Sequence, residues 1–152
     1  MNKKNNTGFI IKETEEAEII PRFLEICADF RKQWEEHLEY WGKDERGMYN
    51  DIAEFAHFIV DSYKDGKTEK FPEVFKQIES YLVNGDEKVK EIISIGLLED
   101  IQNIASHEEH GYEVFEKWLG PVSKKYWKEI EALWQGKSSL ADVIRAEKRR
   151  EK

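Results

Sequence analysis

The chain has 152 residues, of which 39% are apolar and 12% aromatic. This composition is typical of one folded domain and excludes an intrinsically disordered chain, despite the 37% of charged residues. No apolar run is long enough to span a membrane, and the lysines at positions 3 and 4 are not followed by the apolar segment of a signal peptide. A single cysteine, Cys27, cannot form an internal disulfide, so we expect a cytoplasmic protein.

The formal net charge of −8 is unevenly distributed along the chain. Residues 121–152 carry nine basic and five acidic side chains, a net +4, which leaves −12 for residues 1–120. An acidic body repels the phosphates of nucleic acids and speeds the encounter with basic partners. We therefore expect a protein partner and no direct contact with nucleic acid or membrane.

Helical spacing of apolar residues predicts the first two helices. One stripe of apolar side chains runs from Ile20 to Trp41, which predicts one long helix. A second helix is predicted from about Tyr49 to Lys64, with its apolar residues on one side.

Proline, glycine and aspartate mark the limits of the next two helices. Pro72 predicts the start of a third helix and Gly85 its end. Asp86 is a suitable N-cap for a fourth helix, which continues to about Ser106. Apolar residues cover most sides of the fourth helix, so we expect it to be central and buried.

Three shorter helices are predicted in the last third of the chain. The fifth begins near Gly111, and the sixth is capped by Ser123 and ends at Gly136. Ser139 and Asp142 resemble a capping box for a final helix.

These elements define the predicted fold class. No segment alternates as a strand does, and short links join the helices. We predict an all-α, single-domain bundle of six to seven helices, with mostly antiparallel neighbours, over residues 17–144. A flexible segment at 1–16 precedes it, and a charged tail at 145–152 follows it.

No catalytic motif is visible in the sequence. There is no Gly-rich phosphate loop and no nucleophile elbow. His107 and His110 are three residues apart, whereas the zinc-protease helix needs a spacing of four. We predict no metal, no cofactor and no enzymatic activity, and we expect Cys27 to be a core residue. The alternative is an enzyme with a site around Asp100 and the histidines.

Two charged residues fall within apolar stripes. Arg31 lies in the stripe of the first helix and Asp100 in that of the fourth. A buried charge needs a partner, so we expect Arg31 and Asp100 to pair across the core. A Trp or Tyr partner for Asp100, or a place for it in the wall of a pocket, are the alternatives.

The candidate partner-binding residues combine one aromatic anchor with exposed acids. Trp41 ends the first helix beside a charged loop and could anchor an interface, whereas we expect the other tryptophans to point inward. Glu54, His57 and Asp61 share the polar face of the second helix. The acids expected to bind a partner are Asp44, Glu45, Glu54, Asp61, Glu108 and Glu109.

Several segments resemble one family of small, all-helical, largely uncharacterised bacterial proteins. The segments are Phe71–Phe75, Ile78–Glu79, Gly85–Asp86, Ile95–Asn103 and Trp118–Pro121. The resemblance covers about residues 20–136 and is most specific over Gly96–Asn103. Some family members are encoded beside polymorphic or contact-dependent growth inhibition toxins and are regarded as immunity proteins. No catalytic motif accompanies the resemblance.

The resemblance implies a function that suits the charge of this chain. We expect an immunity protein that binds a cognate toxin and neutralises it by occluding its active site or substrate path. A nuclease toxin, such as an RNase delivered by contact-dependent inhibition, is typically basic because it binds phosphates. The alternative is a helical adaptor that binds another protein and has no toxin partner.

Overall fold

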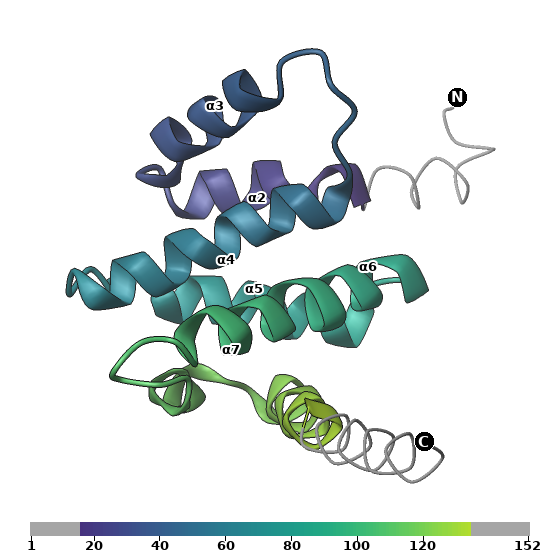
Figure 1. Cartoon of the computed structure of the whole chain (residues 1–152). Coiled ribbons are helices and arrows are strands. Elements are labelled where there is room, and N and C mark those ends of the chain that lie inside the picture. The colour runs from purple at the N-terminus through teal and green to yellow at the C-terminus, as the bar shows by residue number, and fades with distance from the viewer. Residues whose placement is uncertain (1–15, 135–152) are drawn as a thin grey trace, which may run out of the picture.

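Helices form the regular elements of the described part of the chain, residues 16–134 of the computed structural model, and no strand occurs there (Figure 1). The predicted all-α, single-domain fold is confirmed. The expectations for the N-terminal segment, the helix near Ser139 and the charged tail fall outside the described residues. Between residues 16 and 134, no helix combines the length and the apolarity needed to cross a membrane.

The first helical region consists of two helices, where the sequence predicted one. Helix α2 spans Ile19–Ile26 and α3 spans Phe30–Trp41, and the chain turns at residues 27–29. In Figure 1 the two helices run in opposite directions. The link contains neither Gly nor Pro, and Phe23 and Phe30 are both buried, so the apolar spacing continues across the break.

Helix α4 (Met48–Lys64) lies at the centre of the fold and packs against α3 and against the later helices η1 and α7. Helix α5 (Phe71–Asn84) begins with Pro72 in its first turn and ends at Gly85, as predicted. Consecutive long helices reverse direction along the chain (Figure 1). The predicted antiparallel arrangement of sequence neighbours therefore holds for α2 to α5.

The predicted fourth helix is one continuous rod with a π-helical centre. It comprises α6 (Glu87–Glu91), the π-helix η1 (Ile92–Leu98) and α7 (Glu99–Ala105). The Asp86 carboxylate accepts a hydrogen bond of 2.9 Å from the Val89 amide, so the predicted N-cap is confirmed.

The π-helical segment packs closely against α4. Six of its seven residues are buried, and a Cβ at Gly96 would lie 3.0 Å from Ile52 Cγ2. Glycine therefore allows the two backbones to approach here. Ile95 is 54% exposed, although the sequence predicted it inside.

Helix η2 (Glu113–Trp118) is a 3-10 helix, and a final described helix covers residues 121–134. The Glu79 carboxylate of α5 accepts hydrogen bonds from the Val122 amide (2.9 Å) and the Ser123 amide (2.8 Å). Ser123 was expected to cap this helix, but its hydroxyl instead accepts a bond from the Gly120 amide. A side chain distant in sequence thus caps the helix.

The buried residues agree with most of the expected core. Trp127 is fully buried, and Trp34 and Trp118 are partly buried against the core. Trp134 is 42% exposed, so its predicted inward position is wrong. Cys27 is a core residue as predicted, and burial raises the pKa of its thiol to about 11.

Candidate functional site

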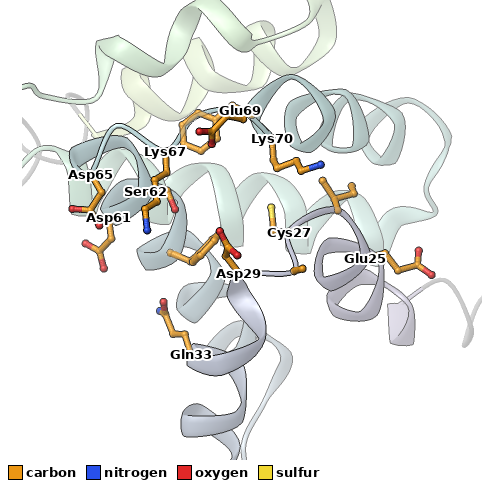
Figure 2. Close-up of a pocket in the computed structure, with 14 residues that line it drawn as sticks. Glu25, Cys27, Asp29, Gln33, Asp61, Ser62, Asp65, Lys67, Glu69 and Lys70 are labelled. Atoms are coloured by element: carbon orange, nitrogen blue, oxygen red, sulfur yellow. The ribbon is translucent and has the colours of Figure 1, made fainter.

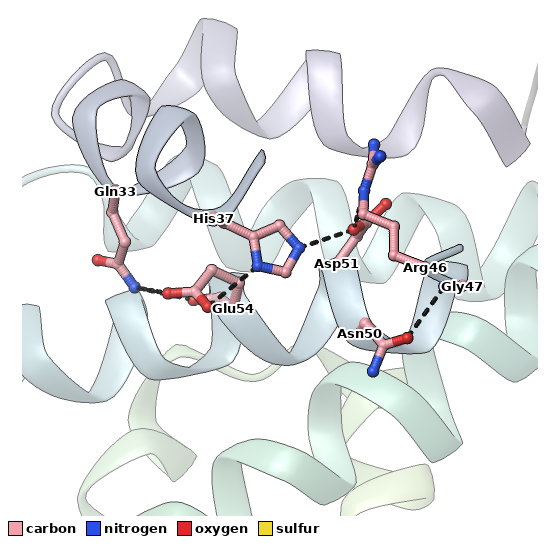
Figure 3. A network of polar contacts seen from close by, with 7 residues as sticks. All are labelled: Gln33, His37, Arg46, Gly47, Asn50, Asp51 and Glu54. Atoms are coloured by element: carbon pink, nitrogen blue, oxygen red, sulfur yellow. Dashed lines mark hydrogen bonds and ion pairs between the residues drawn. The ribbon is translucent and has the colours of Figure 1, made fainter. Parts of the chain in front are cut away.

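A network of polar side chains joins α3 to α4 beside the loop at residues 42–47 (Figure 3). His37 of α3 is only 8% exposed and lies between two carboxylates of α4. Its Nε2 is 2.8 Å from Asp51 Oδ1, and its Nδ1 is 3.3 Å from Glu54 Oε1. Each ring nitrogen therefore faces a carboxylate oxygen.

Arg46 and Gln33 complete this network. Arg46 Nε donates to Asp51 Oδ1 at 2.8 Å, and its guanidinium lies 5.6 Å from the centre of the Trp34 ring. Gln33 Nε2 donates to Glu54 Oε2 at 2.6 Å. The network thus fixes the loop and both helices to one another, because connected hydrogen bonds in a low-dielectric site strengthen and orient each other.

The network supports an aromatic pair at the surface. Trp41 is half-buried and packs edge-on against His37, with 6.4 Å between ring centres. Tyr40 packs against Trp41 at 6.2 Å and is 84% exposed. An aromatic side chain exposed to this extent and held on a rigid support is typical of an interface anchor.

Exposed acids flank this pair in the sequence, on α3 and in the loop that follows it. Their carboxylates form no ion pair and no hydrogen bond with any residue between 16 and 134. The acids are Glu36, Glu39, Asp44 and Glu45. We call these four acids with Tyr40 and Trp41 the acidic aromatic corner. It has the aromatic centre and the charged rim that protein-binding surfaces combine.

Residues 20–135 match a protein family described as a domain of unknown function (DUF7674). The chain belongs to this family. The small family expected from the sequence is thereby supported. No curated protein and no solved structure matches the chain. The matched range contains the whole acidic aromatic corner, so this surface is part of the DUF7674 domain.

The seven predicted partner-binding residues fall into two groups in the DUF7674 domain. Trp41, Asp44 and Glu45 belong to the acidic aromatic corner. Glu54 lies beneath it, half-buried in the polar network, and is not the freely exposed acid that the sequence predicted. It faces His37 because α3 covers this side of α4.

The second group lies toward the C-terminal end of α4. Asp61 is exposed at a cavity, and Glu109 is exposed in the loop after α7. Glu108 Oε1 lies 3.3 Å from Lys64 Nζ, which ties that loop to α4. The sequence could not separate the two groups, since their positions depend on how the helices pack.

Four residues of the network and the corner were not predicted from the sequence: His37, Tyr40, Arg46 and Asp51. One signal for His37 was present: it lies three residues after Trp34 and four before Trp41, so all three share a helix face. Asp51 carries no such signal. Its role depends on the packing of α3 against α4.

The expected pairing of Arg31 with Asp100 is wrong. Arg31 is exposed, because α3 turns the helix face that carries Phe30 and His37 inward. The Asp100 side chain is half-buried and makes no hydrogen bond or ion pair with the described residues. Burial, and then the nearby Glu99 carboxylate, raise the pKa of the Asp100 carboxyl, and His57 lowers it; together they bring this pKa to about 6.

We expect Asp100→Asn to stabilise the protein at pH 8 by about 2 kcal/mol. The folded-state pKa is raised from its ordinary value of 3.8, so the ionised carboxylate costs stability above pH 6. Below pH 3.8 the carboxyl is protonated in both states and the difference should vanish. Urea unfolding at several pH values measures this, with Glu109→Gln as an exposed control. An equal effect at all pH values would contradict the prediction.

The histidines do not converge on one another in the described part of the chain. His57 and His107 are exposed, whereas His110 is half-buried and packs against Tyr63 with 4.8 Å between ring centres. His110 Nδ1 lies 2.6 Å from the Gly111 carbonyl oxygen. Between residues 16 and 134 no group of three His, Cys, Asp or Glu side chains could hold a metal ion.

Proposed function

We propose that the protein is an immunity-type inhibitor that binds a basic toxin, such as a secreted RNase, through the acidic aromatic corner. The observation that carries this proposal is the exposure of Tyr40 beside Trp41, among four acids that have no partner in residues 16–134. Exposed aromatic side chains gain most from burial at an interface, and unpaired carboxylates attract a basic surface.

The support beneath the corner suits an inhibitor. His37, Asp51 and Arg46 hold the end of α3 against α4, so the surface is ordered before a partner arrives. A preorganised surface loses less conformational entropy on binding. The proposed mechanism is stoichiometric occlusion of the toxin's phosphate-binding path by carboxylates, with no turnover.

Co-expression with the product of the gene immediately upstream tests the proposal. We expect the two proteins to co-purify. We also expect the neighbour alone to inhibit growth, and co-expression of this protein to restore it. A complex without any effect on growth would favour the helical adaptor. Absence of a complex, with healthy cells, would overturn the proposal.

The double variant Tyr40→Ala/Trp41→Ala should weaken binding to the partner at least about tenfold, because aromatic anchors dominate interface energies. Isothermal titration calorimetry against the purified partner measures this effect. Val83→Ala removes an exposed apolar side chain from α5 and serves as the control, with unchanged affinity. Equal affinities for the double variant and the control would place the interface elsewhere.

A further inference from the structure

A cavity of about 460 Å³ lies toward the C-terminal end of α4 (Figure 2). Its walls come from the α2–α3 link, the second half of α4 and the loop that leads into α5. The volume lies in the range of pockets that bind small molecules or single side chains. It is distinct from the acidic aromatic corner, which lies beside the N-terminal end of α4.

The interior surface of the cavity is partly apolar. Phe58, Phe71 and Cys27 contribute to it. Phe58 is fixed by ring contacts with Phe30 and Phe55, at 5.2 and 6.0 Å between ring centres. These side chains can contact the methylene groups of a ligand.

The charged residues around the cavity have an excess of unpaired acids. Four lining carboxylates form no ion pair and no hydrogen bond within residues 16–134, and one lysine, Lys67, is likewise unpaired. The four acids are Asp29, Asp61, Asp65 and Glu69. Unpaired carboxylates attract a cation, and the attraction is stronger where the cavity wall excludes part of the water.

The walls also contain one further acid, Glu25, and one further base, Lys70, and each of them already has a partner. Glu25 Oε1 lies 2.9 Å from Arg22 Nη1, and Lys70 Nζ lies 3.7 Å from Glu73 Oε1. They therefore do not neutralise the four acids. The balance of charge around the cavity remains negative, which disfavours phosphates and other anions as ligands.

Ser62 provides a separate indication of a ligand. Ser62 is 8% exposed and lies in the wall of the cavity (Figure 2). Its hydroxyl has no hydrogen-bond partner among residues 16–134. The hydroxyl oxygen is not sealed inside the protein, so it is open to the cavity and can accept a hydrogen bond from a ligand there. An N–H donor inside the cavity would satisfy the Ser62 oxygen.

We propose that this cavity binds the side chain of an arginine or lysine that projects from the partner protein. The carboxylates pair with its charge, Phe58 contacts its methylene groups, and Ser62 accepts one of its N–H hydrogen bonds. The identity of the partner rests on the function proposed above, whereas the preference for a cation rests on the cavity alone. The cavity is then a second contact point for a basic partner, besides the acidic aromatic corner.

A peptide titration tests the preference for a cation without any partner protein. We expect acetyl-Gly-Arg-Gly-amide to cause saturable amide shifts in the ¹⁵N-labelled full chain, centred on residues 25–29 and 58–70. The same peptide with citrulline in place of arginine is neutral and nearly isosteric, and should bind at least tenfold more weakly. Shifts that do not saturate, or equal binding of both peptides, would overturn the proposal.

Variants then assign the binding to the cavity. The double variant Asp61→Asn/Asp65→Asn should raise the Kd for the arginine peptide about tenfold, since each lost ion pair weakens binding severalfold. The matched control Glu113→Gln/Glu129→Gln removes the same charge from exposed positions and should change the Kd less than twofold. Equal effects of the two variants would indicate general electrostatic attraction and contradict the proposal.

Partner binding separates this inference from the proposed function. A toxin complex that keeps its full affinity with Asp61→Asn/Asp65→Asn would overturn the assignment to a partner side chain, although the proposed function would stand. Conversely, saturable peptide binding without any toxin complex would support the cation site and overturn the immunity function.

Discussion

Asp51→Ala should lower the free energy of unfolding by about 3 kcal/mol, because it removes one member of a buried ionic network. The Asp51 carboxylate lies 2.8 Å from His37 Nε2 and from Arg46 Nε. Without it, the Nε2 atom of His37 has no partner and remains buried between α3 and α4. The guanidinium of Arg46 also loses the contact that holds the loop against α4.

Chemical denaturation compares this variant with Asp44→Ala, which removes an acid of equal size from the loop that precedes α4. Asp44 is exposed and unpaired within residues 16–134, so its loss should change stability by less than about 0.5 kcal/mol. A double-mutant cycle with His37→Ala should give a coupling energy of about 1–3 kcal/mol. Additive effects of the two substitutions would contradict the network.

Glu79→Gln should lower the free energy of unfolding by about 2 kcal/mol at pH 7, because two charge-assisted hydrogen bonds are weakened. The Glu79 carboxylate caps the helix at residues 121–134 through the Val122 and Ser123 amides. Burial alone would raise the pKa of Glu79, but the hydrogen bonds from Ser123 and Val122 outweigh it, and the pKa lies below its ordinary value. The capping carboxylate is therefore more stable when ionised.

The lowered pKa of Glu79 determines how the effect of Glu79→Gln depends on pH. A lowered folded-state pKa means that the stabilisation is complete above the ordinary pKa and is lost as the pH falls through the folded-state pKa. The difference between wild type and Glu79→Gln should thus shrink in acid. Hydrogen exchange should show faster opening of residues 121–134 in the variant. Glu73→Gln, at an exposed position of α5, is the control and should leave both readouts unchanged.

The fold class was predictable because apolar spacing and capping residues are local signals. Pro72, Gly85 and Asp86 placed the limits of α5 and α6 within a residue or two. The break at residues 27–29 was not predictable, because it contains no helix-breaking residue and keeps the apolar spacing. The expected position of Arg31 was wrong because α3, as a separate helix, turns the face that carries Phe30 and His37 inward.

The candidate site was predictable only where exposure follows from the sequence. Trp41, Asp44 and Glu45 were identified because they lie at the end of a helix and in a charged loop. His37 and Asp51 were missed because their burial depends on how α3 covers α4. Likewise, the capping of residues 121–134 by Glu79 joins groups 43 and 44 positions apart in sequence, which no local pattern predicts.

The π-helical centre of the rod formed by α6, η1 and α7 affects how relatives of this chain should be aligned. Hydrogen bonds to the fifth residue back let a helix hold one more residue between the same two ends than an α-helix does. A relative that lacks one residue between Asp86 and Gln102 can therefore form an unbroken α-helix and keep both ends in place. A gap in that interval then indicates a change of helix type, and the surfaces formed by α3 and α4 remain comparable across the family.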